Sequence, residues 1–299
     1  ASKNIEDFLS ERLHQELTKS FIDKRISALS RDLKQDLKLE TTIKENNDVI
    51  INKQLIGNLK GLKLNLEFSK GTLDTDIKSL KKAARQGIAN ELISRTKEII
   101  EKKELEFKDD YKIYWKNNAV GKIKKGANYL SPEIDIITDE ALDDNYRKDL
   151  SNALNIWIKN LISEELKDLT NLIKLKNKNK YLRALAFQLY ESNGVLKRDE
   201  VKDIVNLISK DDRKQFRQLG IKIGRYHIFL PRMLKPKAVN LRILLWKFHN
   251  NTMSDNKIPK SGLNFLVDEA LSLNSNFLLL CGFEKFRNFY VRVDILEKL

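Results

Sequence analysis

The first 175 residues contain a repeated segment, and this repeat constrains the fold more than any other feature of the sequence. DVIINKQLIGNLKG (48–61) and KIYWKNNAVGKIKKG (112–126) align with a shift of 64 residues, which places Gly57 on Gly121. The same shift carries LSR in the first copy onto ISR in the second, inside the segments that precede the two hairpins. A repeat of this kind is one supersecondary unit that packs against its copy. The sequence therefore favours two related units in series, with a chance match as the alternative.

Each unit is predicted to be a helix followed by a three-stranded meander. Apolar residues at helical spacing run from Leu13 to Leu33 in the first copy and from Ile88 to Ile100 in the second. A further amphipathic helix over residues 141–175 is expected to close the pair.

Turn residues support the two meanders. The segments 52–54 and 116–118 contain Asn, which tolerates a positive φ and suits tight hairpin turns. Third strands are expected over residues 62–68 and 133–137, where apolar and polar residues alternate.

The excess positive charge is concentrated at the C-terminal end. The formal net charge is +14, and residues 176–299 carry 24 basic and 12 acidic side chains. Between Arg213 and Ser254 there are ten Lys or Arg and no Asp or Glu. Segregated charge of this kind is typical of a binding face. The predicted domains are a first repeat (1–104), a second repeat with its closing helix (105–176) and a basic domain (177–299), with a linker over 172–182.

The basic domain is predicted to be mostly helical α+β, so the whole chain belongs to the α+β class. Asn193-Gly194 is expected to end one helix, Ser209 to cap another, and Pro236 to occupy the first position of a buried apolar helix. The predicted elements are helices over 181–192, 198–209, 210–219 and 237–249, one strand over 221–230, and a final strand that runs into a helix.

Four basic side chains of this domain, Arg225, Arg232, Lys235 and Lys237, are expected at the rim of its core. Lys and Arg are almost never fully buried without a partner, and no acidic residue is near these in sequence. Contact with phosphates is the functional interpretation, and ion pairs with distant acidic residues are the structural one. The predicted contacts with nucleic acid are Arg213, Lys214, Arg217, Lys222, Arg225, Arg232, Lys235 and Lys237, with Tyr226 as a stacking residue.

The sequence contains none of the common catalytic or metal-binding motifs. It has no GxxxxGK[ST] loop, no GxGxxG after a strand, and no HExxH, CxxC or GxSxG. His14, His227 and His249 stand alone, so no catalytic residue and no metal ligand is predicted. Asp139 and Asp268 each begin an Asp-Glu pair after an apolar run, as in nucleotide-binding motors. Without a phosphate loop, they are better interpreted as first-turn residues of helices, where negative charge suits the dipole.

Cysteine content and hydropathy restrict the compartment. The single cysteine, Cys281, excludes an internal disulfide and fits a reducing compartment. No apolar run approaches the roughly 18 residues that a membrane-spanning helix needs, and no signal-peptide pattern is present. A cytoplasmic protein that does not bind membranes is expected. The start at Ala-Ser-Lys and the helix-like end suggest a piece of a longer protein.

Three segments of the basic domain resemble a known family. LGIKIGRYHIFLPRMLKPKAVNLRILLWKFHN, IPKSGLNFLV and CGFEKFRNFYVRVDILEKL resemble the C-terminal region of an alphaproteobacterial superfamily-2 helicase, related to the RNA helicase of the mitochondrial degradosome. LHQELTKSFIDKR, DVIINKQLIGNLKG and DEALDD fit the same region in order. Arg232 and Met233 depart from the pattern, at positions expected to be small or apolar.

The resemblance implies that the whole protein is an ATP-dependent nucleic-acid helicase. Its motor domains would precede residue 1 and would bind ATP and magnesium. No catalytic residue of the family maps onto this chain, so the chain by itself is not expected to be an enzyme or to hold a cofactor. Two functions remain open. The chain either grips RNA or DNA beside the motor domains, or serves as a scaffold that docks the motor domains or a partner ribonuclease.

Overall fold

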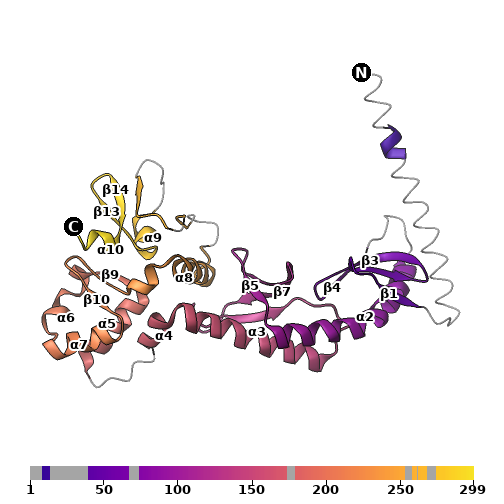
Figure 1. Cartoon of the computed structure of the whole chain (residues 1–299), viewed down its shortest axis with the longest axis horizontal. Coiled ribbons are helices and arrows are strands. Elements are labelled where there is room, and N and C mark those ends of the chain that lie inside the picture. The colour runs from indigo at the N-terminus through magenta and orange to yellow at the C-terminus, as the bar shows by residue number, and fades with distance from the viewer. Residues whose placement is uncertain are drawn as a thin grey trace. The chain divides into compact units, whose positions relative to one another are not determined.

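The structure, a computed structural model, divides the chain into two compact units. It describes residues 9–13, 40–66, 74–173, 179–252, 258–260, 262–267 and 274–299. Unit 1 consists of Ala1–Ile123 and Ile134–Leu154, and unit 2 of Lys124–Glu133 and Asn155–Leu299. Helices and antiparallel sheets occur in both, so the α+β class is confirmed (Figure 1). The three predicted domains stay a prediction, because a division by contacts does not show which segments fold independently.

Unit 1 contains two four-stranded antiparallel meanders, the first followed by a long helix and the second by a helix whose later half belongs to unit 2. In both sheets the strands pair in the order in which they follow in the sequence. The first group comprises β1 (Thr41–Ile43), β2 (Asp48–Ile51), β3 (Gln54–Lys60), β4 (Lys63–Leu66) and α2 (Asp74–Lys102). The second comprises β5 (Leu105–Phe107), β6 (Lys112–Trp115), β7 (Asn118–Lys124), β8 (Glu133–Ile136) and α3 (Asp144–Glu165).

The two meanders are equivalent in detail. β5, β6 and β7 begin 64 residues after β1, β2 and β3, which is the shift of the sequence repeat. A bulge after Val49 recurs after Ile113. Asn47 and Tyr111 occupy equivalent positions and both have a positive φ, although Tyr is poorly suited to it. This agreement of irregular features favours duplication over a chance match.

The hairpin turns form where the sequence predicts them. Asn52 and Lys53 connect β2 to β3, and Lys116 and Asn117 connect β6 to β7; all four have a positive φ. Two-residue turns with both central residues at positive φ match the right-handed twist of antiparallel strands. The turn chemistry therefore sets the register, in which Ile51 is opposite Gln54.

Each meander has one strand more than predicted. The additional strands, β1 and β5, have only three residues each, TTI and LEF, which is too short for a clear alternation of apolar and polar residues. The long helix predicted over 141–175 is also different. It begins at Asp144 and is interrupted at Leu166, so that α4 (Lys167–Ile173) is a separate helix.

The interpretation of Asp139 as a first-turn helix residue is wrong. Asp139 is buried in the loop before α3, where its carboxylate accepts hydrogen bonds from Arg85 Nε at 3.0 Å and from the backbone N–H of Ala141. Its backbone carbonyl accepts a bond from Arg147 Nη2. Asp139 therefore organises this loop. Asp268, most of the helix predicted over 13–33 and residues 174–178 of the predicted linker lie outside the described residues.

Unit 2 begins with a helical half and ends with a small sheet. The last strand, Phe289–Arg292, runs directly into a helix, as predicted. Among the described residues, no helix is long and apolar enough to cross a membrane. The first half contains α5 (Lys180–Glu191), β9 (Val195–Lys197), η1 (Arg198–Val201), α6 (Lys202–Asn206), α7 (Lys210–Gln218), β10 (Lys222–Ile223), β11 (His227–Phe229) and η2 (Pro231–Leu234). The second contains α8 (Pro236–His249), β12 (Phe265–Val267), α9 (Ser275–Leu280), β13 (Phe283–Phe286), β14 (Phe289–Arg292) and α10 (Val293–Leu296).

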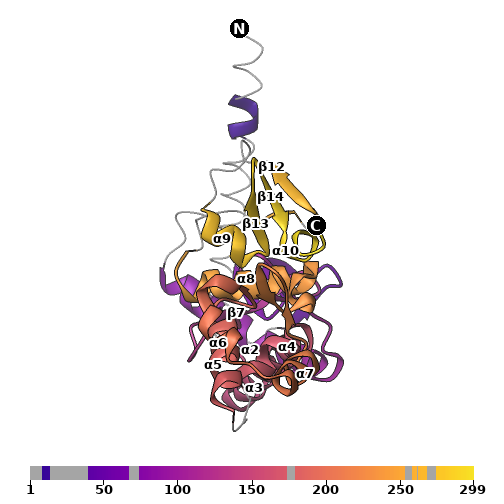
Figure 2. The ribbon, with the colours of Figure 1, turned by 90° about the vertical axis from the view of Figure 1, so that its left-hand side faces the viewer.

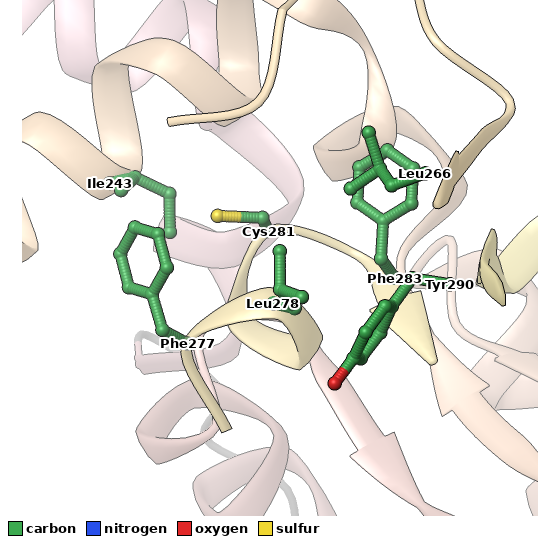
Figure 3. Close-up of a cluster of buried hydrophobic side chains, with 7 residues drawn as sticks. All are labelled: Ile243, Leu266, Phe277, Leu278, Cys281, Phe283 and Tyr290. Atoms are coloured by element: carbon green, nitrogen blue, oxygen red, sulfur yellow. The ribbon is translucent and has the colours of Figure 1, made fainter. Parts of the chain in front are cut away.

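The sheet of β12, β14 and β13 packs its inner face on α8 and α9. Leu266, Phe283 and Tyr290 from the three strands lie in one buried cluster with Ile243 of α8 and Leu278 of α9 (Figure 3). Cys281 lies in the same cluster (Figure 3). The sheet and α8 also lie side by side in both ribbon views (Figures 1 and 2). Burying these apolar side chains gives the sheet a core, which three short strands lack in isolation.

Arg242 of α8 is fully buried and joins the parts of unit 2. Its guanidinium donates hydrogen bonds to the backbone carbonyls of Asn193 after α5, Met233 in η2 and Leu280 at the end of α9. Burial lowers the pKa of Arg242 to about 10, which leaves it charged at neutral pH. The carbonyl dipoles replace the water that the cation loses on burial. The sequence does not predict this role, because Arg242 lies among apolar residues of α8.

The two equivalent glycines Gly57 and Gly121 give a first prediction. A Cβ on Gly57 would lie against the backbone of Asn65 and Leu66 in β4, which cannot yield without moving the strand. A Cβ on Gly121 would meet side chains, with Ile134 at 3.0 Å and Leu154 at 3.1 Å. Gly57→Ala should therefore reduce the free energy of unfolding by about 1–3 kcal/mol, and Gly121→Ala by less, in urea titrations. Equal losses in the two variants would contradict this difference in packing.

Removal of the Arg242 guanidinium should destabilise unit 2. Arg242→Met preserves much of the side-chain volume but leaves three buried carbonyls without a partner, which should cost about 3 kcal/mol or more in urea unfolding. Arg242→Lys should recover part of this loss. The control is Lys202→Met on the exposed side of α6, which should change stability by less than about 0.5 kcal/mol. An Arg242→Met variant as stable as this control would refute the joining role.

Candidate nucleic-acid interface

The first half of unit 2 has the element order of a winged helix-turn-helix. Helix α5 is followed by strand β9, the helical pair α6 and α7, and the hairpin β10–β11, and the sheet order is β10-β11-β9. A three-residue turn, 207–209, separates α6 from α7, as in helix-turn-helix pairs. These elements lie together in Figure 1. In DNA-binding proteins with such a pair, the second helix is the one that contacts nucleic acid.

Helix α7 begins at a cap that the sequence predicts. The Ser209 hydroxyl accepts a bond from the backbone N–H of Asp212, and the Asp212 carboxylate accepts a bond from the backbone N–H of Ser209. Hydrogen bonds from the Ser209 side chain and backbone lower the pKa of Asp212. This capping box fixes the first turn of α7. The helix ends before Gly220, which has a φ of +79°.

Helix α7 presents cations to solvent. Phe216 is fully buried beneath it, whereas Arg213, Lys214 and Arg217 are exposed. Arg213 and Arg217 are four residues apart and therefore share one side of the helix. No carboxylate of the described residues forms an ion pair with Arg213, Lys214 or Arg217. These side chains, together with Lys222 of β10, are called the basic face below.

A hollow of about 480 Å³ lies at the basic face. Its lining includes Arg213 and Arg217 from α7, Lys222 from β10 and Arg198 from η1. Arg198 was not predicted, because it lies among acidic neighbours in LKRDEVKD and far from the other three in sequence. Only the pairing of β9 with β11 brings it there. One of its guanidinium nitrogens donates to the Gly224 carbonyl at 3.0 Å, which leaves the other nitrogen atoms for a ligand.

The predicted single strand over 221–230 is instead a hairpin, and its loop is the wing. β10 and β11 are antiparallel and residues 224–226, here called the wing loop, connect them. Gly224 and the charged residue after it interrupt the apolar pattern. This interruption indicates a turn, which the interpretation as one strand did not take into account. The wing loop exposes Arg225 and Tyr226, with the Arg225 guanidinium carbon 5.2 Å from the Tyr226 ring centroid.

Glu297 fixes the wing loop from the end of the chain. Its carboxylate accepts hydrogen bonds from the backbone N–H groups of Arg225, Tyr226 and His227, the last two at 2.9 and 2.7 Å. Burial alone would raise the pKa of Glu297, but these bonds together lower it. Successive N–H groups that converge in this way form an anion-binding concavity. The loop that carries two predicted contacts is thus held in one position.

The remaining predicted contacts lie around the start of α8. Arg232 is exposed in η2 and forms an ion pair with Asp168 of α4 at 3.5 Å, which matches the structural alternative raised for it. Lys235 is the N-cap of α8, Pro236 takes the first helical position as predicted, and Lys237 follows. Both lysines are exposed and have no ion pair among the described residues. Neither lines the hollow of the basic face.

His227 is isolated in sequence but not in the structure. Its ring lies between Glu297, 3.1 Å from Nδ1, and Glu284 of β13, 3.4 Å from Nε2. Lys197 donates to Glu284 at 3.0 Å. Burial would raise the pKa of Glu284, but its bonds to His227 and Lys197 lower it. This cluster joins the elements from α5 to β11, called the winged module below, to the C-terminal sheet of β12, β14 and β13.

The described residues show no arrangement typical of a metal or thiol site. No group of three or more His, Cys, Asp or Glu among them could hold a metal ion. Burial raises the pKa of Cys281 to about 12, so its thiol is protonated in the core. Cys281 is therefore a core residue and not a reactive thiol.

In comparisons with known proteins, no family model, no curated protein and no solved structure matches the chain.

The Glu297 contacts predict a pH-dependent stability. The pKa of Glu297 is lower in the folded chain than its ordinary value of 4.5. The carboxylate therefore contributes fully above about pH 4.5, and its contribution is lost as the pH falls through the folded pKa. Glu297→Gln should reduce the free energy of unfolding by about 1–3 kcal/mol at pH 7, with a smaller difference below pH 4.5. Glu200→Gln, at an exposed position in η1, is the control. A difference that stays constant from pH 7 to pH 3 would refute the role of the ionised carboxylate.

Proposed function

We propose that this chain binds RNA or DNA through phosphate contacts made by the basic face and the wing loop. The observation that carries the proposal is the exposure of Arg213, Lys214 and Arg217 on the second helix of a helix-turn-helix pair without ion-pair partners among the described residues. Lys and Arg that neutralise phosphates release counterions, which supplies most of the affinity in sequence-independent binding.

The geometry suits a curved polyanion better than a small anion. The hollow at the basic face is lined by four cations from three elements, Arg198 among them, so their charges are spread along a surface. Arg225 extends this charge onto the wing loop. Residues 213–254 contain no acidic side chain that would oppose phosphate, and Asp211 and Asp212 lie at the start of α7 before this run.

In the whole protein, this region would act as the accessory part of an ATP-dependent helicase. That step rests on the sequence resemblance alone. ATP and magnesium would belong to the motor domains, and this chain would hold the strand beside them in the same polypeptide. The alternative role, as a scaffold for the motor domains or a ribonuclease, uses the same cations against an acidic protein surface.

Charge reversal on the basic face tests the proposal. Arg213→Glu/Arg217→Glu/Lys222→Glu should weaken binding of a fluorescent ~20-mer at least about 100-fold at low salt, measured by anisotropy with RNA and with DNA. The slope of log K against log salt should become smaller by roughly 2–3, because about three phosphate contacts are lost.

A matched control keeps the same change in net charge. Lys53→Glu/Lys63→Glu/Lys82→Glu alters three exposed lysines of unit 1 and should retain nearly the parental affinity. An equal loss of affinity in both variants would mean that net charge alone explains the effect. It would contradict binding at a defined face. A folded parent chain that binds neither RNA nor DNA at low salt would overturn the proposal and favour the scaffold.

A further inference from the structure

The C-terminal sheet has a second face that the core does not use. Strand residues alternate between faces, so the burial of Leu266 and Tyr290 on the inner face (Figure 3) turns their neighbours outward. Phe265, Phe286 and Phe289 are 59%, 43% and 45% exposed. Three half-exposed phenylalanines on one small sheet are unusual for a surface with no partner.

The outward rings lie close to one another. Phe286 of β13 is directly opposite Phe289 of β14 in the register. Phe289 and Phe265 of β12 are in edge-to-face contact, with centroids 6.5 Å apart. The three rings therefore cross the sheet from strand to strand.

The row of rings continues onto the wing loop. Phe286 and Tyr226 line the same pocket of about 330 Å³, into which the polar side chains of Lys197 and Lys285 also reach. Tyr226 is 50% exposed. The pocket joins the winged module to the sheet, and the His227 cluster beneath it fixes their spacing. Tyr226, Phe286, Phe289 and Phe265 are called the aromatic strip below.

Cations accompany the aromatic strip. Arg225 lies over Tyr226, and the Arg287 guanidinium carbon is 5.7 Å from the Phe286 ring centroid. Of the two carboxylates at the pocket, Glu284 is bonded to Lys197 and His227, and Asp199 lies at the exposed rim. Exposed rings interleaved with Arg match a strand that offers bases and phosphates alternately. An apolar protein segment would offer no acceptor to the guanidinium groups.

We infer that the aromatic strip binds a single strand of nucleic acid by stacking its unpaired bases. This inference rests on the proposed function and adds its substrate class: a strand with unpaired bases next to the part gripped by the basic face. Bases stack on Phe and Tyr rings with little regard to sequence, because every base has a π-face. Arg225 and Arg287 hold the intervening phosphates. A duplex hides its base faces in the stack and cannot use the strip.

Removal of two rings tests the inference with little change in hydrophobicity. Phe286→Leu/Phe289→Leu keeps both positions apolar and should weaken binding of a labelled single-stranded ~12-mer about tenfold or more in anisotropy titrations. Binding of a blunt duplex of the same sequence, and its salt slope, should stay unchanged. Phe187→Leu, at an exposed ring of α5, is the matched control and should alter neither.

The outcomes separate the two proposals. In one outcome, duplex binding depends on the basic face and the double leucine variant still binds the single strand. This result would overturn the stacking role alone and favour a protein partner for the aromatic strip. Loss of binding to both probes in a variant that folds as judged by circular dichroism would also refute it. Absence of binding by the parent chain would overturn the proposed function and the inference with it.

A fluorescence measurement reports stacking directly. Phe289→Trp places an indole in the aromatic strip. The emission that this indole adds to that of the parent chain should be quenched by the single strand but not by the duplex. Phe187→Trp should show no such difference. Equal quenching of Phe289→Trp by both probes would contradict recognition of unpaired bases.

Discussion

The buried guanidinium of Arg242 is the interaction on which the architecture of unit 2 depends. It links the turn after α5, the 3₁₀ segment η2 and the end of α9 through three backbone carbonyls. A cation without a carboxylate partner is costly to bury unless dipoles replace its water, so these carbonyls must stay in place together. The winged module and the C-terminal sheet are consequently held around one helix, α8.

A second polar link, through carboxylates, acts nearer the surface. Glu297 fixes the wing loop through its backbone, and Glu284 reaches across to His227 and Lys197. The acidic side chains that approach this region therefore accept hydrogen bonds mainly from backbone N–H groups and from His227. The arginines of the basic face remain exposed. The same links place Tyr226 beside Phe286 at one pocket. Stability and the proposed binding surface thus follow from the same few contacts.

Much of unit 1 could be predicted, because its signals are local. Hairpin turns rich in Asn and a repeat with the same shift in several places predict the meanders, and apolar spacing predicts α2 and α3. The short strands β1 and β5 were missed because three residues form a strand only by pairing with a neighbour. The role of Asp139 was missed because its partner Arg85 is 54 residues away.

The sequence by itself determined the class of the fold, the repeat, the N-cap of α7, the start of α8 at Pro236 and the concentration of exposed cations after Arg213. Each of these follows from interactions within a few residues or from the cost of burying a charge. The tertiary structure decided the rest. It made the segment 221–230 a hairpin, placed Arg198 in the hollow at the basic face, buried Arg242, and aligned three phenylalanines with Tyr226. These features depend on contacts between segments distant in sequence, which local patterns do not encode.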